Sequence, residues 1–244
     1  MRSVPFVALL ALVLGCSLLG AGSAQAREVL LDTQALRVEN VSGQSVMHFA
    51  AFRAETEAYV LTGVSGRFQQ KDELLEAFGT EQEPATLSKM PAAGGSAGEE
   101  GAASGEGESD GPMSVTATKV IRIDFREERL YAEGNVRYTS AQTRAASDLL
   151  MIDNRDAVHA AVAELIAEMA PGEPRTLVEA FFAGLAPQAR LILLRGNVRL
   201  QREDSEMYAA WMLLEDADEE NFISVAGPGQ PLQLKVQLED DSSE

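Results

Sequence analysis

The sequence predicts an all-β fold that is built from a repeated strand unit and carries an inserted helical hairpin. The first observation is internal repetition: Leu130–Tyr138 (LYAEGNVRY) recurs further along the chain as Ile192–Leu200 (ILLRGNVRL). The match continues without a gap, so that Asp148–Asp153 (DLLMID) falls on Ala210–Glu215 (AWMLLE). The second observation is an alternation of apolar and polar residues in both copies, typical of half-buried strands. One structural unit has therefore been used more than once.

The chain begins with the features of an export signal. Arg2 supplies a positive start, residues 4–19 are apolar, and Ala24-Gln25-Ala26 matches the small-x-small pattern that signal peptidase cleaves. We expect cleavage near Ala26. Two alternatives remain: lipidation of Cys16, which ends an imperfect lipobox, or retention of residues 4–21 as an N-terminal anchor. All three place the body of the protein outside the cytoplasm, and the periplasm is the compartment we expect.

Composition narrows the class of partner. The chain has 20 basic and 38 acidic residues and a formal net charge of −18, which argues against binding to nucleic acid or to an anionic membrane surface. Cys16 is the only cysteine, so the mature body has no disulfide framework and must be held by sheet pairing and core burial.

The elements are expected in a definite order. The segment over 91–113 is rich in Gly, Glu and Ser, and it cannot bury enough apolar surface to offset the chain entropy lost on folding. The predicted organisation is a signal peptide at 1–26, N-terminal β repeats at 27–90, a disordered acidic Gly-rich loop at 91–113, a first repeat at 114–155, a helical hairpin at 156–186, a second repeat at 187–238 and an acidic tail at 239–244.

The hairpin is predicted from a change of period. Val158, Val162, Leu165, Ile166 and Met169 follow helical spacing, and two prolines separate them from a second helix over about 175–185. We expect the hairpin either to cover one end or one face of the sheet, or to dock a partner protein.

The sequence offers no convincing site for catalysis, a metal or a cofactor. The string Gly94-Gly95-Ser96-Ala97-Gly98 matches a nucleophile elbow, but it lies in the low-complexity run without the strand and helix that this chemistry needs. His48 and His159 have no carboxylate partners at metal spacing. We expect a non-enzymatic protein with no cofactor.

The repeat itself resembles a known family. Leu130–Tyr138, followed by Arg144–Leu150 (RAASDLL), is similar to the OstA-like repeat of LptA-type lipopolysaccharide-transport proteins, which is also the organic solvent tolerance-like N-terminal domain of their outer-membrane partner. Ile192–Leu214 is a looser second copy, with Ala210 in place of Asp148. The resemblance covers roughly 115–153 and 190–236. The acidic loop, the helical hairpin and the net negative charge depart from the family pattern.

The resemblance implies an extended β-jellyroll whose apolar groove holds the lipid A acyl chains of lipopolysaccharide. It also implies a bridge to the outer membrane of a Gram-negative cell, in which jellyroll proteins of both membranes join by edge-strand addition, and a possible head-to-tail homo-oligomer. An inner-membrane-anchored LptC-like partner and a structural envelope scaffold that binds other proteins are the alternatives.

The residues expected to line the interior are apolar and lie in both repeats, and each either contacts lipid or belongs to an ordinary core. They are Leu130, Ala132, Val136, Tyr138, Leu149, Met151, Ile192, Leu194, Val198, Leu200, Trp211 and Leu213. Gly134 and Gly196 are expected to allow close approach of backbones, because glycine has no Cβ.

Overall fold

The computed structural model describes most of the body of the chain. The described residues are 10–13, 28–41, 44–56, 59–89, 113–127, 129–141, 143–169, 172–185, 189–202, 205–216, 221–227 and 231–236. The predicted acidic loop (apart from Met113), the acidic tail, and the leader apart from residues 10–13 lie outside them.

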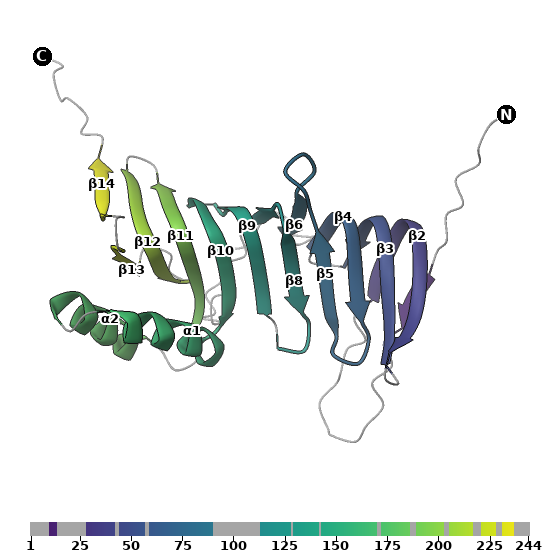
Figure 1. Cartoon of the computed structure of the whole chain (residues 1–244), viewed down its shortest axis with the longest axis horizontal. Helices are drawn as coiled ribbons and strands as arrows, with labels where there is room; N and C mark the ends of the chain where they lie inside the picture. Colours follow the sequence, from purple (N-terminus) through teal and green to yellow (C-terminus); the bar gives the residue numbers. More distant parts are fainter. Residues whose placement is uncertain are drawn as a thin grey trace, which may run out of the picture.

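Fourteen strands and two helices form within the described residues (Figure 1). The strands are β1 (Leu10–Val13), β2 (Glu28–Val41), β3 (Gln44–Glu55), β4 (Tyr59–Gln69), β5 (Leu74–Phe78), β6 (Ala85–Lys89), β7 (Ser114–Ala117), β8 (Val120–Asp124), β9 (Arg129–Thr139), β10 (Arg144–Asn154), β11 (Arg190–Arg202), β12 (Ser205–Glu215), β13 (Phe222–Val225) and β14 (Gln233–Val236). All the described pairings are antiparallel, and their order along the molecule follows the order in the chain closely.

The long strands bend, and each half of a bent strand takes a different neighbour. In β4, residues 59–62 pair with β6, whereas residues 65–69 pair with β5. In β9, residues 129–133 pair with β8 and residues 137–139 with β7. In β12, residues 205–208 pair with β14 and residues 211–214 with β13. The halves thus form two facing layers with apolar side chains between them. The first layer contains β5, β8 and β13, and the second contains β6, β7 and β14. The expected all-β jellyroll is confirmed.

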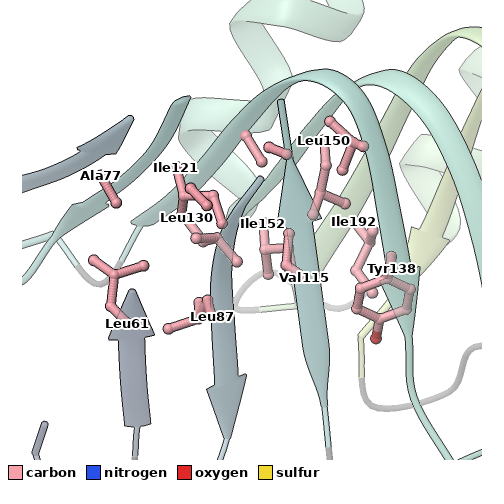
Figure 2. Close-up of a cluster of buried hydrophobic side chains, with 14 of the residues drawn as sticks. Leu61, Ala77, Leu87, Val115, Ile121, Leu130, Tyr138, Leu150, Ile152 and Ile192 are labelled. Atoms are coloured by element: carbon pink, nitrogen blue, oxygen red, sulfur yellow. The ribbon is translucent and has the colours of Figure 1, made fainter. Parts of the chain in front are cut away.

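The core between the layers is shown in Figure 2. Leu61 and Leu87 of the second layer point toward Ala77, Ile121 and Leu130 of the first layer. All five side chains are at most 5% exposed. Burial of this surface is the main stabilising contribution in a body whose described residues contain no cysteine.

The two sequence repeats adopt the same backbone irregularity. Gly134 and Asn135 both have positive φ (89° and 41°), and so do Gly196 and Asn197 (77° and 47°). The register of β10 shifts between Ser147 and Leu149 against β9, and the pairing of β11 with β12 shifts between Arg195 and Val198. A β-bulge at each Gly-Asn pair sharpens the local twist and marks the bend of the strand.

The hairpin packs on the outer face of the first layer. It consists of α1 (Arg155–Glu168) and α2 (Glu173–Gly184), which lie beneath the C-terminal strands in Figure 1. Val158, Val162 and Val178 are at most 1% exposed and pack with Leu193 and Leu213 of the sheet. Of the two roles expected for the hairpin, covering a face of the sheet is therefore confirmed.

The segment predicted as a leader contributes one described strand. β1 pairs with the start of β2, Leu10 opposite Leu31 and Val13 opposite Glu28. No helix among the described residues is long and apolar enough to span a bilayer.

Candidate functional site

The apolar space between the layers is the candidate site, and most of the predicted interior residues lie in it. Eight of them are at most 5% exposed and belong to one core cluster. They are Leu130, Ala132, Val136, Tyr138, Ile192, Leu194, Val198 and Leu200. Their alternation with polar residues was sufficient to assign the face, because the interior positions of β9 and β11 remain even-numbered on both sides of each Gly-Asn bulge.

Four predicted interior residues lie on the opposite face, and the expectation for them is corrected. Leu149 is half-buried and stands opposite Glu133 on the outer face. Met151, Trp211 and Leu213 pack against the helices rather than between the layers. The residues that take their place in the interior are Leu150, Ile152, Met212 and Leu214. The extra residue of each bulge lies in β9 or β11: Val136 to Ala132 is four steps opposite three from Ser147 to Leu150, and Val198 to Leu194 is four steps opposite three from Ala209 to Met212. The odd number of steps exchanges the two faces of β10 and β12.

Gly134 and Gly196 lie where their strands bend, Gly134 against the turn between β7 and β8 and Gly196 against β10. A Cβ on Gly134 would be 2.6 Å from Lys119 Cγ, and one on Gly196 would be 2.5 Å from Asp148 Oδ2. Asn197 Nδ2 donates a hydrogen bond to Asp148 Oδ2 at 2.8 Å. Asp148 of the first repeat therefore holds the Gly-Asn bulge of the second.

The N-terminal end of the interior is uncovered. Leu36 and Val38 of β2 stand opposite Phe49 and Met47, which belong to the core. Because paired residues share a face of the sheet, Leu36 and Val38 continue the interior surface, yet they are 40% and 58% exposed. The apolar interior thus extends from a closed centre onto an open end.

A small apolar pocket opens between the layers near this end. The second layer contributes Ala54, Thr56, Tyr59 and Leu61, and the first layer contributes Leu75, Ile123 and Phe125. Two of the lining residues carry hydroxyls, Thr56 and Tyr59, and Thr56 Oγ1 accepts a hydrogen bond from the amide of Tyr59 at 2.9 Å. The space is about 10 Å³, roughly that of one water molecule, and its other lining side chains are apolar.

Sequence reasoning did not assign a role to the residues of this pocket. Its members come from segments far apart in the chain, and the N-terminal strands carry only a weak likeness to the repeat. The alternation of Tyr59 and Leu61, and of Ile123 and Phe125, was the available signal; it placed each residue on a strand but did not show which strands face one another.

Charged residues lie on the outer face, away from the pocket. Glu76 of β5 is 1% exposed and accepts hydrogen bonds from Arg67 Nε and from Arg122 Nε, so it joins β4, β5 and β8. Glu133 forms an ion pair with Lys119 at 2.9 Å and accepts a hydrogen bond from Tyr131 at 3.0 Å. The hydrogen bond from Lys119, followed by that from Tyr131, lowers the pKa of Glu133.

The histidines lie apart in the fold. His48 lies in β3 with Glu39 Oε2 3.4 Å away, and His159 lies in α1 with its ring 4.8 Å from that of Phe182. Across the described ranges, no three metal-ligating side chains gather into a possible metal site.

Comparison with known proteins finds similarity among solved structures. No family model and no curated protein sequence matches this chain. Among solved structures, the chain is similar to LptH, the LptA homologous periplasmic component of the conserved lipopolysaccharide transport device from Pseudomonas aeruginosa. The two chains are 11% identical, the TM-score is 0.39, and the match covers 51% of this chain and 75% of LptH.

Proposed function

We propose that this protein is a periplasmic, non-enzymatic carrier or bridge component for lipopolysaccharide transport to the outer membrane. The observation that carries the proposal is the apolar interior between the two layers, which continues onto the uncovered residues Leu36 and Val38. Acyl chains exposed to water cost about 0.8 kcal/mol per CH₂. An apolar groove that continues to the exposed surface removes that cost while the sugars stay in water.

The resemblance of the repeats to the OstA-like unit supports the same proposal. Both copies share the Gly-Asn bulge, and the first copy's Asp148 contacts the second copy's Asn197. In this proposal the partners are lipopolysaccharide and other jellyroll transport proteins, and the mature chain starts after cleavage near Ala26. Sequencing the N-terminus of the mature protein separates this from the lipoprotein and from an anchored LptC-like partner, because a start at Arg27 excludes both.

The proposal is tested by co-purification. Residues 27–244 are secreted into the periplasm of a lipopolysaccharide-producing host, purified without detergent, and analysed for bound glycolipid by mass spectrometry. We expect lipid A species in near-stoichiometric amount. A lipid-free protein with an intact β-sheet circular dichroism spectrum would contradict the proposal and favour an envelope scaffold whose apolar interior is only a core.

A further inference from the structure

The outer face of the second layer carries a group of cations at its C-terminal end. The strands β9, β10, β11 and β12 lie side by side there (Figure 1), and the residues that alternate with the core point outward. Four exposed outward residues are cations: Arg137, Arg144, Arg199 and Lys235. Among the described residues that pair across these strands at the same level, Glu206 of β12 is the one carboxylate that faces them. A chain with a net charge of −18 therefore has an excess of positive charge at this place.

Three of the cations surround one alanine. Arg137 of β9 and Arg199 of β11 both stand directly opposite Ala146 of β10. Arg144 lies two residues away on β10 and points to the same side of the sheet. Directly paired residues have Cβ atoms about 5 Å apart, and diagonal neighbours are about 7–8 Å apart. The three long side chains can therefore converge above the small side chain of Ala146.

Two of these guanidinium groups have no carboxylate partner. Arg199 forms an ion pair with Glu206, which Lys235 also approaches at 3.5 Å. Within the part of the chain that the structure describes, neither Arg137 nor Arg144 takes part in an ion pair or a side-chain hydrogen bond. Their charges are thus compensated only by solvent.

Arginines on the first layer are neutralised within the fold instead. Arg67 and Arg122 both bond to the buried Glu76, and Arg129 Nε lies 2.7 Å from Asp153 Oδ2. Like charges close together on a sheet repel one another and lower its stability. A cluster that the protein does not compensate is suited to an anion from outside.

The geometry favours a phosphate monoester as that anion. Its charge is between −1.5 and −2 at about pH 7, and it has three strong acceptor oxygens, so one oxygen is available to each guanidinium. Arginine binds phosphate through paired N–H donors of its planar group. A carboxylate offers two oxygens and a single charge. A nucleic acid is disfavoured, because the net charge of −18 repels an extended polyanion.

We infer that Arg137, Arg144 and Arg199 form a binding site for one phosphate monoester, centred over Ala146 on the outer face of the second layer. The site lies outside the apolar interior. It therefore goes beyond the proposed function and does not require that the protein carries a lipid. The phosphate belongs either to a phosphorylated sugar or to free inorganic phosphate, and the experiment distinguishes the two sources.

The site is tested by isothermal titration calorimetry at low ionic strength and about pH 7, above the second pKa of phosphate, which is about 6. The full chain is expressed in a Gram-negative host and purified as the host processes it. It is titrated with inorganic phosphate and with glucosamine 6-phosphate, and glucosamine alone is the blank. We expect saturable binding that depends on the phosphate. Tighter binding of the sugar phosphate would assign a phosphorylated sugar, and equal binding would assign free phosphate.

Two substitutions test the charge and the shape of the site separately. Arg144→Gln removes one guanidinium and should weaken binding about ten-fold, as expected for the loss of a hydrogen bond to a charged group. Ala146→Leu keeps every charge and fills the centre of the site, so it should also weaken binding about ten-fold or more. Both positions point away from the core, and the circular dichroism spectrum should stay unchanged.

Arg53→Gln is the matched control. Arg53 is exposed on the same outer face, in β3 opposite Thr62, and its guanidinium lies 2.9 Å from Glu55. The substitution makes the same change of charge far from Ala146, and binding should stay as in the wild type.

Three results would overturn the inference. The first is the absence of saturable binding by either phosphate compound. The second is an equal loss in Arg144→Gln and Arg53→Gln, which would show that only the overall charge matters. The third is unchanged binding in Ala146→Leu, which would show that the phosphate is not held over Ala146. Co-purification of lipid A tests the interior and not this face, so the failure of one proposal is distinguishable from the failure of the other.

Discussion

At the scale of single residues, the Gly-Asn bulge depends on the glycine of each pair. Gly196 has φ of 77°, and a Cβ would meet the Asp148 side chain at 2.5 Å. We expect Gly196→Ala to lower the free energy of unfolding by at least about 1–2 kcal/mol, the cost of placing an L-residue in the left-handed region. Urea denaturation followed by circular dichroism measures it.

Gly184 provides the matched control for that substitution. It ends α2, and no heavy atom lies within 4 Å of the position that a Cβ would take. Gly184→Ala should be neutral or stabilise by up to about 1 kcal/mol, since alanine favours the helix. Equal destabilisation by both variants would show that the bulge does not require glycine.

The ionisation of Glu133 on the outer face makes the stability of the fold depend on pH. Its pKa is lowered from the usual value of 4.5 by the hydrogen bond from Lys119 and then by that from Tyr131. A carboxylate with a lowered pKa stabilises the fold above pH 4.5 and loses that contribution as the pH falls through its folded pKa. Glu133→Gln should therefore be less stable than the wild type at pH 7, with a small difference because both partners are partly exposed.

The lowered pKa of Glu133 is checked by measuring how the difference in stability between the wild type and Glu133→Gln changes with pH. Urea unfolding of the wild type and of Glu133→Gln is compared at pH 7 and at successively lower pH. The two curves should converge below pH 4.5. A difference that stays constant with pH would mean that the charge of Glu133 has no part in it.

At the scale of elements, one side of α2 packs on the sheet together with α1. Val178 is fully buried against the sheet cluster, whereas its neighbour Leu177 is 56% exposed. Val178→Asp would place a charge without a partner in an apolar interface, and we expect the hairpin to detach or the fold to be lost. Leu177→Asp adds the same charge in solvent and should change the stability by less than about 0.5 kcal/mol.

The fluorescence of Trp211 shows whether the hairpin has detached from the sheet. It is the only tryptophan of the chain and is 5% exposed beneath the hairpin. Its fluorescence emission should shift to longer wavelength in Val178→Asp and stay unchanged in Leu177→Asp. An unshifted spectrum in Val178→Asp, with the helical signal intact, would contradict the packing described here.

The strands show which parts of the fold the periodicity of the sequence predicted correctly. The period of two assigned Leu130, Val136 and Tyr138 to the interior, and the helical period found the hairpin. The same pattern assigned Met151 and Leu213 to the wrong face, because each lies beyond the point where a bulge in the neighbouring strand exchanges the faces of β10 or β12. In β11 and β12 the pattern disappears, since both faces are buried in Leu191–Leu194 and Trp211–Leu214.

The bulges themselves had only an indirect signal in the sequence. Gly134-Asn135 and Gly196-Asn197 are residue types that tolerate positive φ. The shift in β10, however, falls at Ser147 to Leu149, where no glycine marks it. It follows from pairing with the neighbouring strand, which is a contact between residues distant in the chain. The pocket was missed for the same reason, because two layers must face one another before it exists.

At the scale of the whole molecule, the fold is asymmetric along its length. The C-terminal half has an interior crossed by Met207–Ser224 and an outer face covered by helices. Among the described residues, no helix lies over the N-terminal half (Figure 1). Exposed apolar residues continue the core at both ends: Leu36 and Val38 of β2 are 40% and 58% exposed, and Leu234 of β14, which stands opposite Met207, is 59% exposed. Exposed apolar surface that continues a core is a usual mark of a binding region, so both ends are where ligands or partners are expected to act.

A charge placed at the N-terminal end of the groove should reduce ligand binding without preventing the protein from folding. Leu36 is 40% exposed, so Leu36→Glu is expected to cost little stability, yet it puts a carboxylate on the surface that continues the groove. We expect less co-purified glycolipid per chain, measured by mass spectrometry. Gln34→Glu adds the same charge at an exposed position of β2 and should leave the amount unchanged. Equal amounts of glycolipid in both variants would mean that the ligand does not reach the open end, and an equal loss in both would mean that net charge alone controls capture.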